Sequence, residues 1–348
     1  LVTDPGLAPL PPVQRALQVQ PAGLFTGVQP NPVGSNVSDG VEAYRAGGHD
    51  GVVAMGGGSA LDAGKAIALM VGQTRPLFDF EDREDWYTRV NAEGMAPVVA
   101  IPTTAGTGSE VGRVAVITDE STRVKKLIFH PRMLPGRVIL DPELTVGLPP
   151  AITAYTGMDA LAHSLEAYCS PLFHPMADGI GLEALRLIKE SLPRAFREGT
   201  DLEARSAMLA AATMGAAAFQ KGLGAVHSLS HPVGARHGLH HGLLNAIFMP
   251  YVLAFNRPAV ETRIERAAAY LGLRGFEGFQ AWLLELRREL GIPHRLDLPG
   301  ADVEALARLA LEDPSTPTNP VPLTEAALRG LLEQAMAGRV AEATSPRA

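Results

Sequence analysis

The sequence predicts an α/β domain over residues 1–147 followed by an all-helical domain over residues 148–348. Before residue 148, short apolar runs alternate with turns rich in glycine and proline, which is typical of strands and helices around a parallel sheet. After it, long stretches rich in Ala and Leu repeat their apolar residues at a period near 3.6, which predicts helices over 151–168, 177–196 and 202–220. Pro149 and Pro150 mark the boundary, because proline stops a preceding element.

The composition is that of a globular protein and argues against several classes. The 348 residues are 46% hydrophobic and 19% charged, which is enough for a large core. A net charge of −7 argues against a nucleic-acid partner, because phosphate binding needs clustered Lys and Arg. The sequence holds no apolar run of about 18 residues and no export leader, so we expect a cytoplasmic protein without membrane contact. The chain opens in mid-strand, so upstream residues are expected, and Cys169 is expected to be a buried thiol.

Two loops of small residues follow two predicted strands. The first, GGGS at Gly56–Ser59, also opens a helix whose apolar residues recur at helical spacing. The second, TTAGTGS, spans Thr103–Ser109. Glycine lets a ligand approach the backbone, a helix N-terminus offers free N–H groups, and open α/β sheets bind ligands at the carboxyl ends of their strands. The loops therefore favour dinucleotide binding, although the G-x-G-x-x-G fingerprint is absent. The alternative is a tight strand-to-helix turn.

Asp4 lies at the end of the first predicted strand. An acidic residue at this place accepts hydrogen bonds from the two hydroxyls of an adenosine ribose and repels a 2′-phosphate. The alternative role is that of a helix N-cap.

Histidines cluster in one short stretch of the second half. Five of the ten lie within residues 224–246: His227, His231, His237, His240 and His241. His227 and His231 are four residues apart, as are Asp159 and His163, so each pair shares one face of a helix. A chain that folds back after Pro232 would bring His241 to them. One carboxylate with two or three imidazoles suits zinc or ferrous iron. The alternative is a mixture of core and surface histidines, and His237 and His240 are expected to line a pocket or to be solvated.

Four motifs in the same order resemble the iron-containing (group III) alcohol dehydrogenases: GGGSALDAGKA, IPTTAGTGSEV, TGMDALAHSLEAY and HSLSHPVGARHGLHHGLLNAIFMPYVLAFN. The resemblance runs from Asp4 to about Asn256. It implies a dehydroquinate-synthase-like fold, with a Rossmann-like α/β domain, a helical domain and an active site in the cleft between them. It also implies metal-dependent hydride transfer between NAD(H) and a small alcohol or aldehyde. The resemblance favours iron as the metal ion, with zinc as the alternative. It also implies a homodimer or higher homo-oligomer.

The resemblance also assigns roles to single residues. The metal ligands would be Asp159, His163, His227 and His241, with His231 beside the metal as a catalytic proton relay. The loop Gly56, Gly57, Gly58 and Ser59 would hold the pyrophosphate, with Asp62 close by. The adenine and ribose side would be lined by Thr103, Thr104 and Thr107. Lys125 would meet the nicotinamide ribose, and Asp4 the adenosine ribose, which favours NAD over NADP.

The chain departs from the family just before the last expected ligand. Relatives carry an aromatic residue and a proline there, whereas this chain reads ARHGLH. Arg236, His237 and His240 would make the pocket basic, which favours a short hydroxy acid or semialdehyde; the alternative is a solvated loop.

Other classes of protein are alternatives to an alcohol dehydrogenase. Maleylacetate-reductase-like enzymes typically replace metal ligands, whereas all four are present here. NAD-assisted lyases or cyclases of the dehydroquinate synthase type use Glu with two His, whereas this chain has the Asp159/His163 pair. A zinc hydrolase would need no dinucleotide loops, and a non-enzymatic histidine-rich binder would take several ions.

Overall fold

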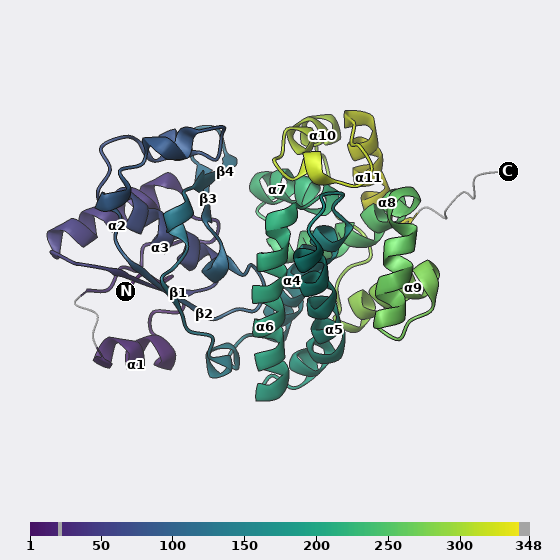
Figure 1. The fold of residues 1–348 in the computed structure, drawn as a ribbon, viewed down its shortest axis with the longest axis horizontal. Coiled ribbons are helices and arrows are strands. Elements are labelled where there is room, and N and C mark those ends of the chain that lie inside the picture. Colours follow the sequence, from purple (N-terminus) through teal and green to yellow (C-terminus); the bar gives the residue numbers. More distant parts are fainter. Residues whose placement is uncertain (20–22, 341–348) are drawn as a thin grey trace. The chain divides into compact units, whose positions relative to one another are not determined.

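The chain divides into two compact units, Leu1–Gly147 and a second that begins at Leu148 (Figure 1). The structure, a computed structural model, describes residues 1–19 and 23–340. The C-terminal tail from residue 341, which the sequence leads us to expect to fray, lies outside these ranges. No helix in the described ranges is long and apolar enough to cross a bilayer.

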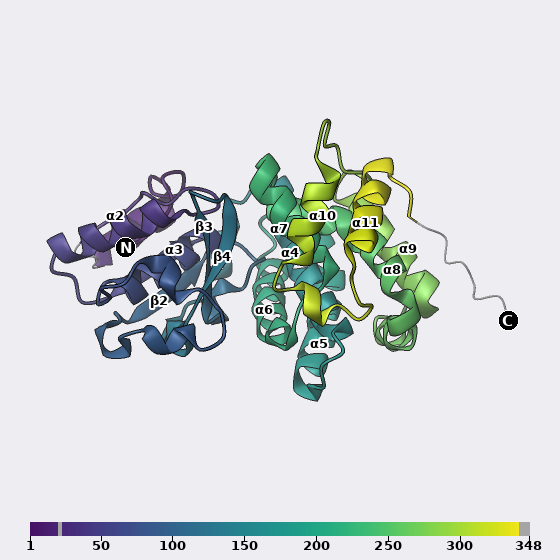
Figure 2. The ribbon, with the colours of Figure 1, turned by 90° about the horizontal axis from the view of Figure 1, so that it is seen from above.

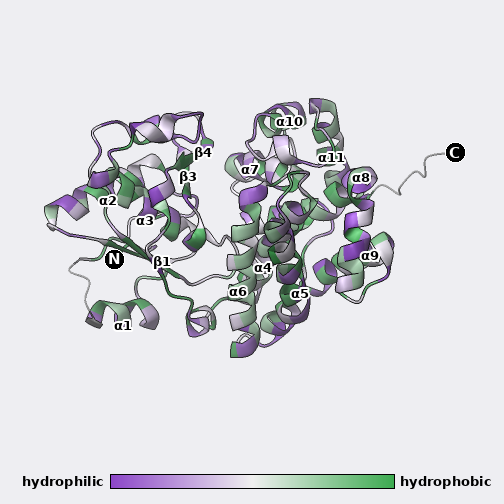
Figure 3. Ribbon diagram, in the orientation of Figure 1, coloured by the Kyte–Doolittle hydropathy of each residue, from purple (hydrophilic) through white to green (hydrophobic). Residues whose placement is uncertain are grey.

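The N-terminal unit contains a parallel sheet with the order β1–β2–β5. Its strands are β1 (Val52–Gly56), β2 (Val98–Pro102) and β5 (Arg137–Val138). Val2 extends the sheet through single parallel bridges to Ala54 and to Phe25. β1 is mostly buried, and Figure 3 shows that its residues are hydrophobic, which is typical of a parallel strand covered on both faces.

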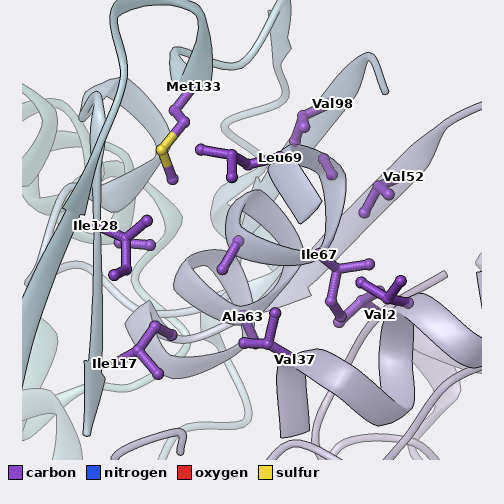
Figure 4. Packing of buried hydrophobic residues seen from close by; sticks show 14 of the residues in the cluster. Val2, Val37, Val52, Ala63, Ile67, Leu69, Val98, Ile117, Ile128 and Met133 are labelled. Atoms are coloured by element: carbon purple, nitrogen blue, oxygen red, sulfur yellow. The ribbon is translucent and has the colours of Figure 1, made fainter. Parts of the chain in front are cut away.

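Helix α3 (Gly58–Met70) is the central helix of this unit. It packs against β1, β2 and the neighbouring helix α2 (Gly34–Ala46). It also packs against an antiparallel hairpin, β3 (Val114–Asp119) and β4 (Val124–Phe129). Figure 4 shows α3 in the middle of the buried cluster, with Ile67 on the side of Val2 and Leu69 on the side of Met133.

The hairpin is a departure from the alternation of strands and helices that the sequence predicts. The loop after β2 leads into one turn of 3₁₀-helix, Ser109–Val111, and then into β3. The Asp119 carboxylate accepts hydrogen bonds from the backbone N–H and the hydroxyl of Ser121, and it forms an ion pair with Lys126 at 2.8 Å. These contacts close the turn and hold the two strands together.

The second unit is all-helical apart from its loops. Its helices are α4 (Pro150–Cys169), α5 (Pro175–Arg197), α6 (Leu202–Ala218), α7 (Ala225–His237), α8 (His241–Tyr270), α9 (Gly275–Glu289), α10 (Val303–Leu311) and α11 (Glu325–Ala337). The three helices predicted from the sequence are α4, α5 and α6. α4 packs against α5, α6 and α8 and is buried on nearly every side, so it is the central helix of this unit. Figure 2 shows α10 and α11 beside α7 and α8.

The remaining ordered segments are short. The N-terminal unit also holds α1 (Pro11–Val19). Single turns of 3₁₀-helix lie at Leu77–Phe80, Trp86–Arg89, Ala92–Gly94, Pro131–Met133, Pro142–Thr145, Phe219–Lys221 and Thr316–Thr318. Cys169 is buried at the end of α4, as expected, and burial raises the pKa of its thiol to about 12.

A buried lysine connects helix α3 to the segment between β2 and β3. The Lys65 ammonium group in α3 donates hydrogen bonds to the carbonyls of Ser109 (2.9 Å), Gly112 (3.4 Å) and Val114 (2.5 Å). It also forms an ion pair with Asp62 at 3.3 Å. Burial lowers the pKa of Lys65, and the charges of Asp62 and Glu110 oppose that shift. The lysine therefore anchors the loop after β2 to the helix that follows β1.

We predict that Lys65→Met lowers the free energy of unfolding by about 2–4 kcal/mol, because three buried carbonyls lose their donor. Urea unfolding followed by circular dichroism measures the change. Lys189→Met in α5 is the control, because the Lys189 ammonium group forms no hydrogen bond or ion pair with the described residues. A loss below 0.5 kcal/mol, on the order of an ordinary surface substitution, would contradict this role for Lys65.

Candidate active site

The two small-residue loops of the N-terminal unit face each other. A Cβ atom on Gly57 would lie 3.5 Å from the Thr104 side chain, and one on Gly58 would lie only 2.5 Å from the Thr107 methyl group. Gly58 therefore has to be glycine for the loops to approach this closely. The loop residues precede or open α3, and no side chain caps the N-terminus of this helix. The N-terminus of α3 therefore lies beside the Thr103–Ser109 loop, and no side-chain cap occupies its first N–H groups.

Asp4 lies beside the glycine loop and also closes its own turn. Its Oδ1 accepts hydrogen bonds of 2.9 Å from the backbone N–H groups of Gly6 and Leu7. Its Oδ2 is 3.7 Å from the position that a Cβ atom on Gly56 would take. Asp4 therefore caps its own turn and also lies near the glycine loop. Its Oδ2 accepts no hydrogen bond from the described residues.

Asp62 and Lys125, which are also expected near the cofactor, lie on α3 and on β4. Both carboxylate oxygens of Asp62 are engaged within the chain: Oδ1 accepts from the Ser109 hydroxyl at 2.6 Å and Oδ2 from the Val116 N–H at 3.1 Å. Asp62 therefore supports the Thr103–Ser109 loop. Lys125 is half-buried on β4, where it pairs with Thr118 of β3.

The helical unit brings together donor atoms from three helices. An oxygen or ring nitrogen of Asp159 (α4), His227 (α7) and His241 (α8) lies within 4.8 Å of the corresponding atom of each of the other two. Asp159 Oδ1 is 3.9 Å from His227 Nε2 and 3.5 Å from His241 Nε2. His163 is not part of this group of three, but its Nε2 lies 3.8 Å from Asp159 Oδ1 and its ring stacks on His227.

Close approach of two helices makes this convergence possible. α8 begins at His241, and the next residue, Gly242, lies against α4: a Cβ atom there would be 2.1 Å from the Tyr155 carbonyl oxygen. Only glycine allows the start of α8 to rest on α4 beside Asp159. α7 continues through Pro232 to His237, and Gly238, in the left-handed conformation at φ 67°, turns the chain back into α8.

A buried carboxylate orients His227. Glu166, seven residues after Asp159 on the same face of α4, accepts a hydrogen bond from His227 Nδ1 at 2.5 Å. Its other oxygen accepts from the Val226 N–H at 2.7 Å. Burial opposes a charge on the ring, but the hydrogen bond and charge of Glu166, aided by Asp159 and Asp313, raise the pKa of His227. With Nδ1 held by Glu166, Nε2 points to the Asp159 carboxylate.

A second carboxylate orients His231. Its Nδ1 lies 2.8 Å from Oδ2 of Asp313, a residue of the loop after α10. Burial raises the pKa of Asp313, but the charge and hydrogen bond of His231 outweigh it and lower this pKa overall. The His231 ring stacks on His241, with centroids 5.2 Å apart, and 18% of its side chain is exposed. His231 is therefore next to the donor group and partly open to solvent.

The loop that carries Asp313 is fastened along α7. The Thr316 hydroxyl donates to the Ser228 hydroxyl at 2.8 Å, and the Thr318 hydroxyl donates to the Leu223 carbonyl at 2.8 Å. Asn319 accepts from the Ala225 N–H at 3.0 Å and forms a reciprocal amide pair with Asn256. The segment Asp313–Asn319 therefore fixes the helix from which His227 and His231 project.

The other basic residues of the cluster are at the surface. Arg236, His237 and His240 are exposed around the turn between α7 and α8, and the His240 ring contacts the Tyr155 ring. Among the described residues, no carboxylate pairs with the Arg236 guanidinium. Exposure agrees with the solvated alternative and also leaves Arg236 open to a ligand.

Three residues of the site were missed by reasoning from the sequence. Glu166 and Asn245 carried a usable signal, because they lie seven residues after Asp159 and four after His241, on the same helix faces. Asn245 Nδ2 is 2.7 Å from Asp159 Oδ1. Asp313 carried none: it is 82 residues from His231 in the sequence.

Comparisons with known proteins point to one family. A model described as iron-containing alcohol dehydrogenase matches residues 1–142, and one described as the C-terminal part of the Fe-containing alcohol dehydrogenase family matches residues 153–336. The chain is 41% identical to the 4-hydroxybutyrate dehydrogenase of Cupriavidus necator, over 97% of this chain and 91% of that protein.

Solved structures give the same result. The crystal structure of a 1,3-propanediol oxidoreductase has a TM-score of 0.92 and 34% identity, over 97% of this chain and 91% of that one. Sulfoacetaldehyde reductase from Bifidobacterium kashiwanohense, in complex with NAD⁺, has a TM-score of 0.87 and 30% identity, over 96% and 89%. The fold and the class of enzyme expected from the sequence are confirmed, and the lyase, cyclase and maleylacetate-reductase alternatives are not favoured. The chain belongs to the iron-containing alcohol dehydrogenase family and is an oxidoreductase of the alcohol dehydrogenase type.

Proposed function

We propose that the chain catalyses NAD(H)- and metal-dependent hydride transfer between a small alcohol and its aldehyde. The observation that carries the proposal is the convergence of Asp159, His227 and His241 from three helices. Bonds of 2.0–2.3 Å in a tetrahedral site place ligand atoms roughly 3.3–3.8 Å apart. Of the three separations measured from Asp159 Oδ1, those to His241 (3.5 Å) and His163 (3.8 Å) lie in this range, and that to His227 (3.9 Å) exceeds it by 0.1 Å, which supports a divalent ion with His163 as the fourth ligand.

A divalent ion held by these residues would supply Lewis acidity to the carbonyl oxygen, and a bound nicotinamide ring would supply or accept the hydride. The family's name favours iron, while one carboxylate and three imidazoles also suit zinc. The relative solved with NAD⁺ favours a nicotinamide cofactor, which the first N–H groups of α3 would hold at its pyrophosphate.

His231 is the residue that we assign to proton movement. Asp313 holds the Nδ1 side of the ring, so the Nε2 side is available to accept or return the proton of the substrate hydroxyl. His231 is outside the group of three donor atoms, and part of its side chain reaches solvent, which agrees with a relay rather than a ligand. The expected cytoplasmic location and homodimer or higher homo-oligomer stay predictions.

We predict that His241→Ala abolishes stoichiometric metal binding and activity together, because the donor group loses one of its three members. Metal content is measured by atomic absorption after anaerobic reconstitution, and the fold by circular dichroism. His237→Ala, in the exposed turn nearby, is the control and should keep both. Full activity of metal-free wild-type protein would refute the proposal.

We predict that Asp4→Asn lowers the preference for NAD over NADP, measured as the ratio of kcat/KM values, by about tenfold or more. The substitution removes the charge that repels a 2′-phosphate while the amide oxygen still caps the turn at Gly6 and Leu7. Asp141→Asn is a matched control, because Asp141 caps another turn of the same unit. A wild-type enzyme that already prefers NADP would show that Asp4 has no such role.

The substrate that we propose is a short hydroxy acid or its semialdehyde. 4-Hydroxybutyrate and sulfoacetaldehyde, which name two of the relatives, both carry an anionic group. The exposed Arg236, five residues before His241, offers a guanidinium that can grip a carboxylate through two parallel hydrogen bonds. The relative named for 1,3-propanediol favours a neutral diol instead.

We predict that wild type prefers succinic semialdehyde to butanal in kcat/KM and that Arg236→Ala reduces this preference about tenfold, on the order of 1.4 kcal/mol. Arg274→Ala, at an exposed position before α9, is the control. Equal kcat/KM values for the two aldehydes in wild type, or a preference untouched by the substitution, would favour the neutral substrate.

A further inference from the structure

Asn245 faces all three atoms of the donor group. It is fully buried in α8, one turn after His241. Its Nδ2 lies 2.7 Å from Asp159 Oδ1, 3.1 Å from His241 Nε2 and 3.2 Å from His227 Nε2. The amide nitrogen thus contacts the very atoms that the proposed function assigns to a metal ion.

The chemistry of the amide explains this orientation. The Asp159 carboxylate is 2% exposed, and a buried carboxylate needs donors or an opposite charge. Nδ2 carries two hydrogens, and its shortest contact satisfies Oδ1 of Asp159, an oxygen that keeps a second lone pair for a cation. Each imidazole nitrogen has a single lone pair, which a bound ion would take in place of the amide hydrogen. Turned the other way, the amide would direct its oxygen at a carboxylate and two ring nitrogens, which is unfavourable in the absence of a cation.

The other end of the same amide is unsatisfied. Asn245 Oδ1 is buried and accepts no hydrogen bond from the described residues. A buried carbonyl without a donor costs about 1–3 kcal/mol, so the contacts of Nδ2 must outweigh that cost. A leucine of similar size would fill the same space without an unsatisfied oxygen. Packing alone therefore gives no reason for an asparagine, whereas the charge of Asp159 does.

We infer that Asn245 is a positioning residue of the metal site, which holds the Asp159 carboxylate in register with His227 and His241 and thereby sets the affinity for the ion. The inference rests on the proposed function, because it assumes that these residues bind metal. Asn245 can reach Asp159 because α8, which carries Asn245, touches α4 at Gly242. Residues that orient metal ligands typically change metal affinity 10–100-fold when they are replaced.

The test compares metal affinity in Asn245→Leu, which keeps the volume, and Asn245→Ala, which leaves room for water. Protein stripped with a chelator is titrated with Co²⁺ in competition with a chromophoric chelator, and the visible absorption of bound Co²⁺ reports ligand geometry. Both variants should raise the dissociation constant at least tenfold and shift the Co²⁺ bands. Thr156→Val is the matched control, because it removes a buried hydroxyl of α4 that bonds only to its own helix.

The outcomes separate the inference from the proposed function. Wild-type protein that binds no Co²⁺ would overturn the proposed function. Wild type that binds one Co²⁺ per chain, with Asn245 variants that match it within twofold and show the same bands, would overturn the role of Asn245 alone. A tenfold loss in both variants, with Thr156→Val unchanged, supports it. If Asn245→Leu does not fold, as judged by circular dichroism, the Ala variant decides between these results.

Discussion

The helical unit is organised around one buried negative charge, the Asp159 carboxylate. A carboxylate that is 2% exposed in an apolar helix is unfavourable unless donors or cations surround it. Four nitrogen atoms surround this carboxylate. Three imidazole Nε2 atoms lie within 3.9 Å of Asp159 Oδ1, and the Asn245 amide nitrogen lies 2.7 Å from it. A site that concentrates lone pairs at such separations is suited to a cation, and this geometry is the support for the metal-dependent chemistry that we propose.

Repetition of one helical spacing builds the group. The pairs Asp159/His163, His227/His231 and His241/Asn245 are each four residues apart, so each lies on one face of its own helix. The outer residues then fix the inner ones: Glu166 holds His227, and Asp313 holds His231. The N-terminal unit also contains a buried charge, which here is positive. The Lys65 ammonium group donates hydrogen bonds to three backbone carbonyls of the segment after β2.

Much of this could be predicted from the sequence, and the physical reason is local periodicity. The spacing of four identified Asp159, His163, His227 and His231, and the Gly-rich turns identified the two loops that face each other. What escaped prediction depends on contacts between distant segments. The hairpin β3–β4 and the Asp313–His231 pair require residues far apart to meet, which no local pattern records. Asp62 and Lys65 lie in a helix whose spacing predicts only burial, whereas their carboxylate and ammonium groups tie down a loop more than forty residues away.

The central claim is that a single divalent ion binds at the Asp159 carboxylate. Anomalous diffraction from crystals of the iron-loaded protein, recorded on both sides of the iron absorption edge, tests it directly. The account predicts one strong peak roughly 2.0–2.3 Å from Asp159 Oδ1 and from the Nε2 atoms of His227 and His241, with His163 completing the set. A peak held by other residues, or none at this position in a fully loaded crystal, would contradict it.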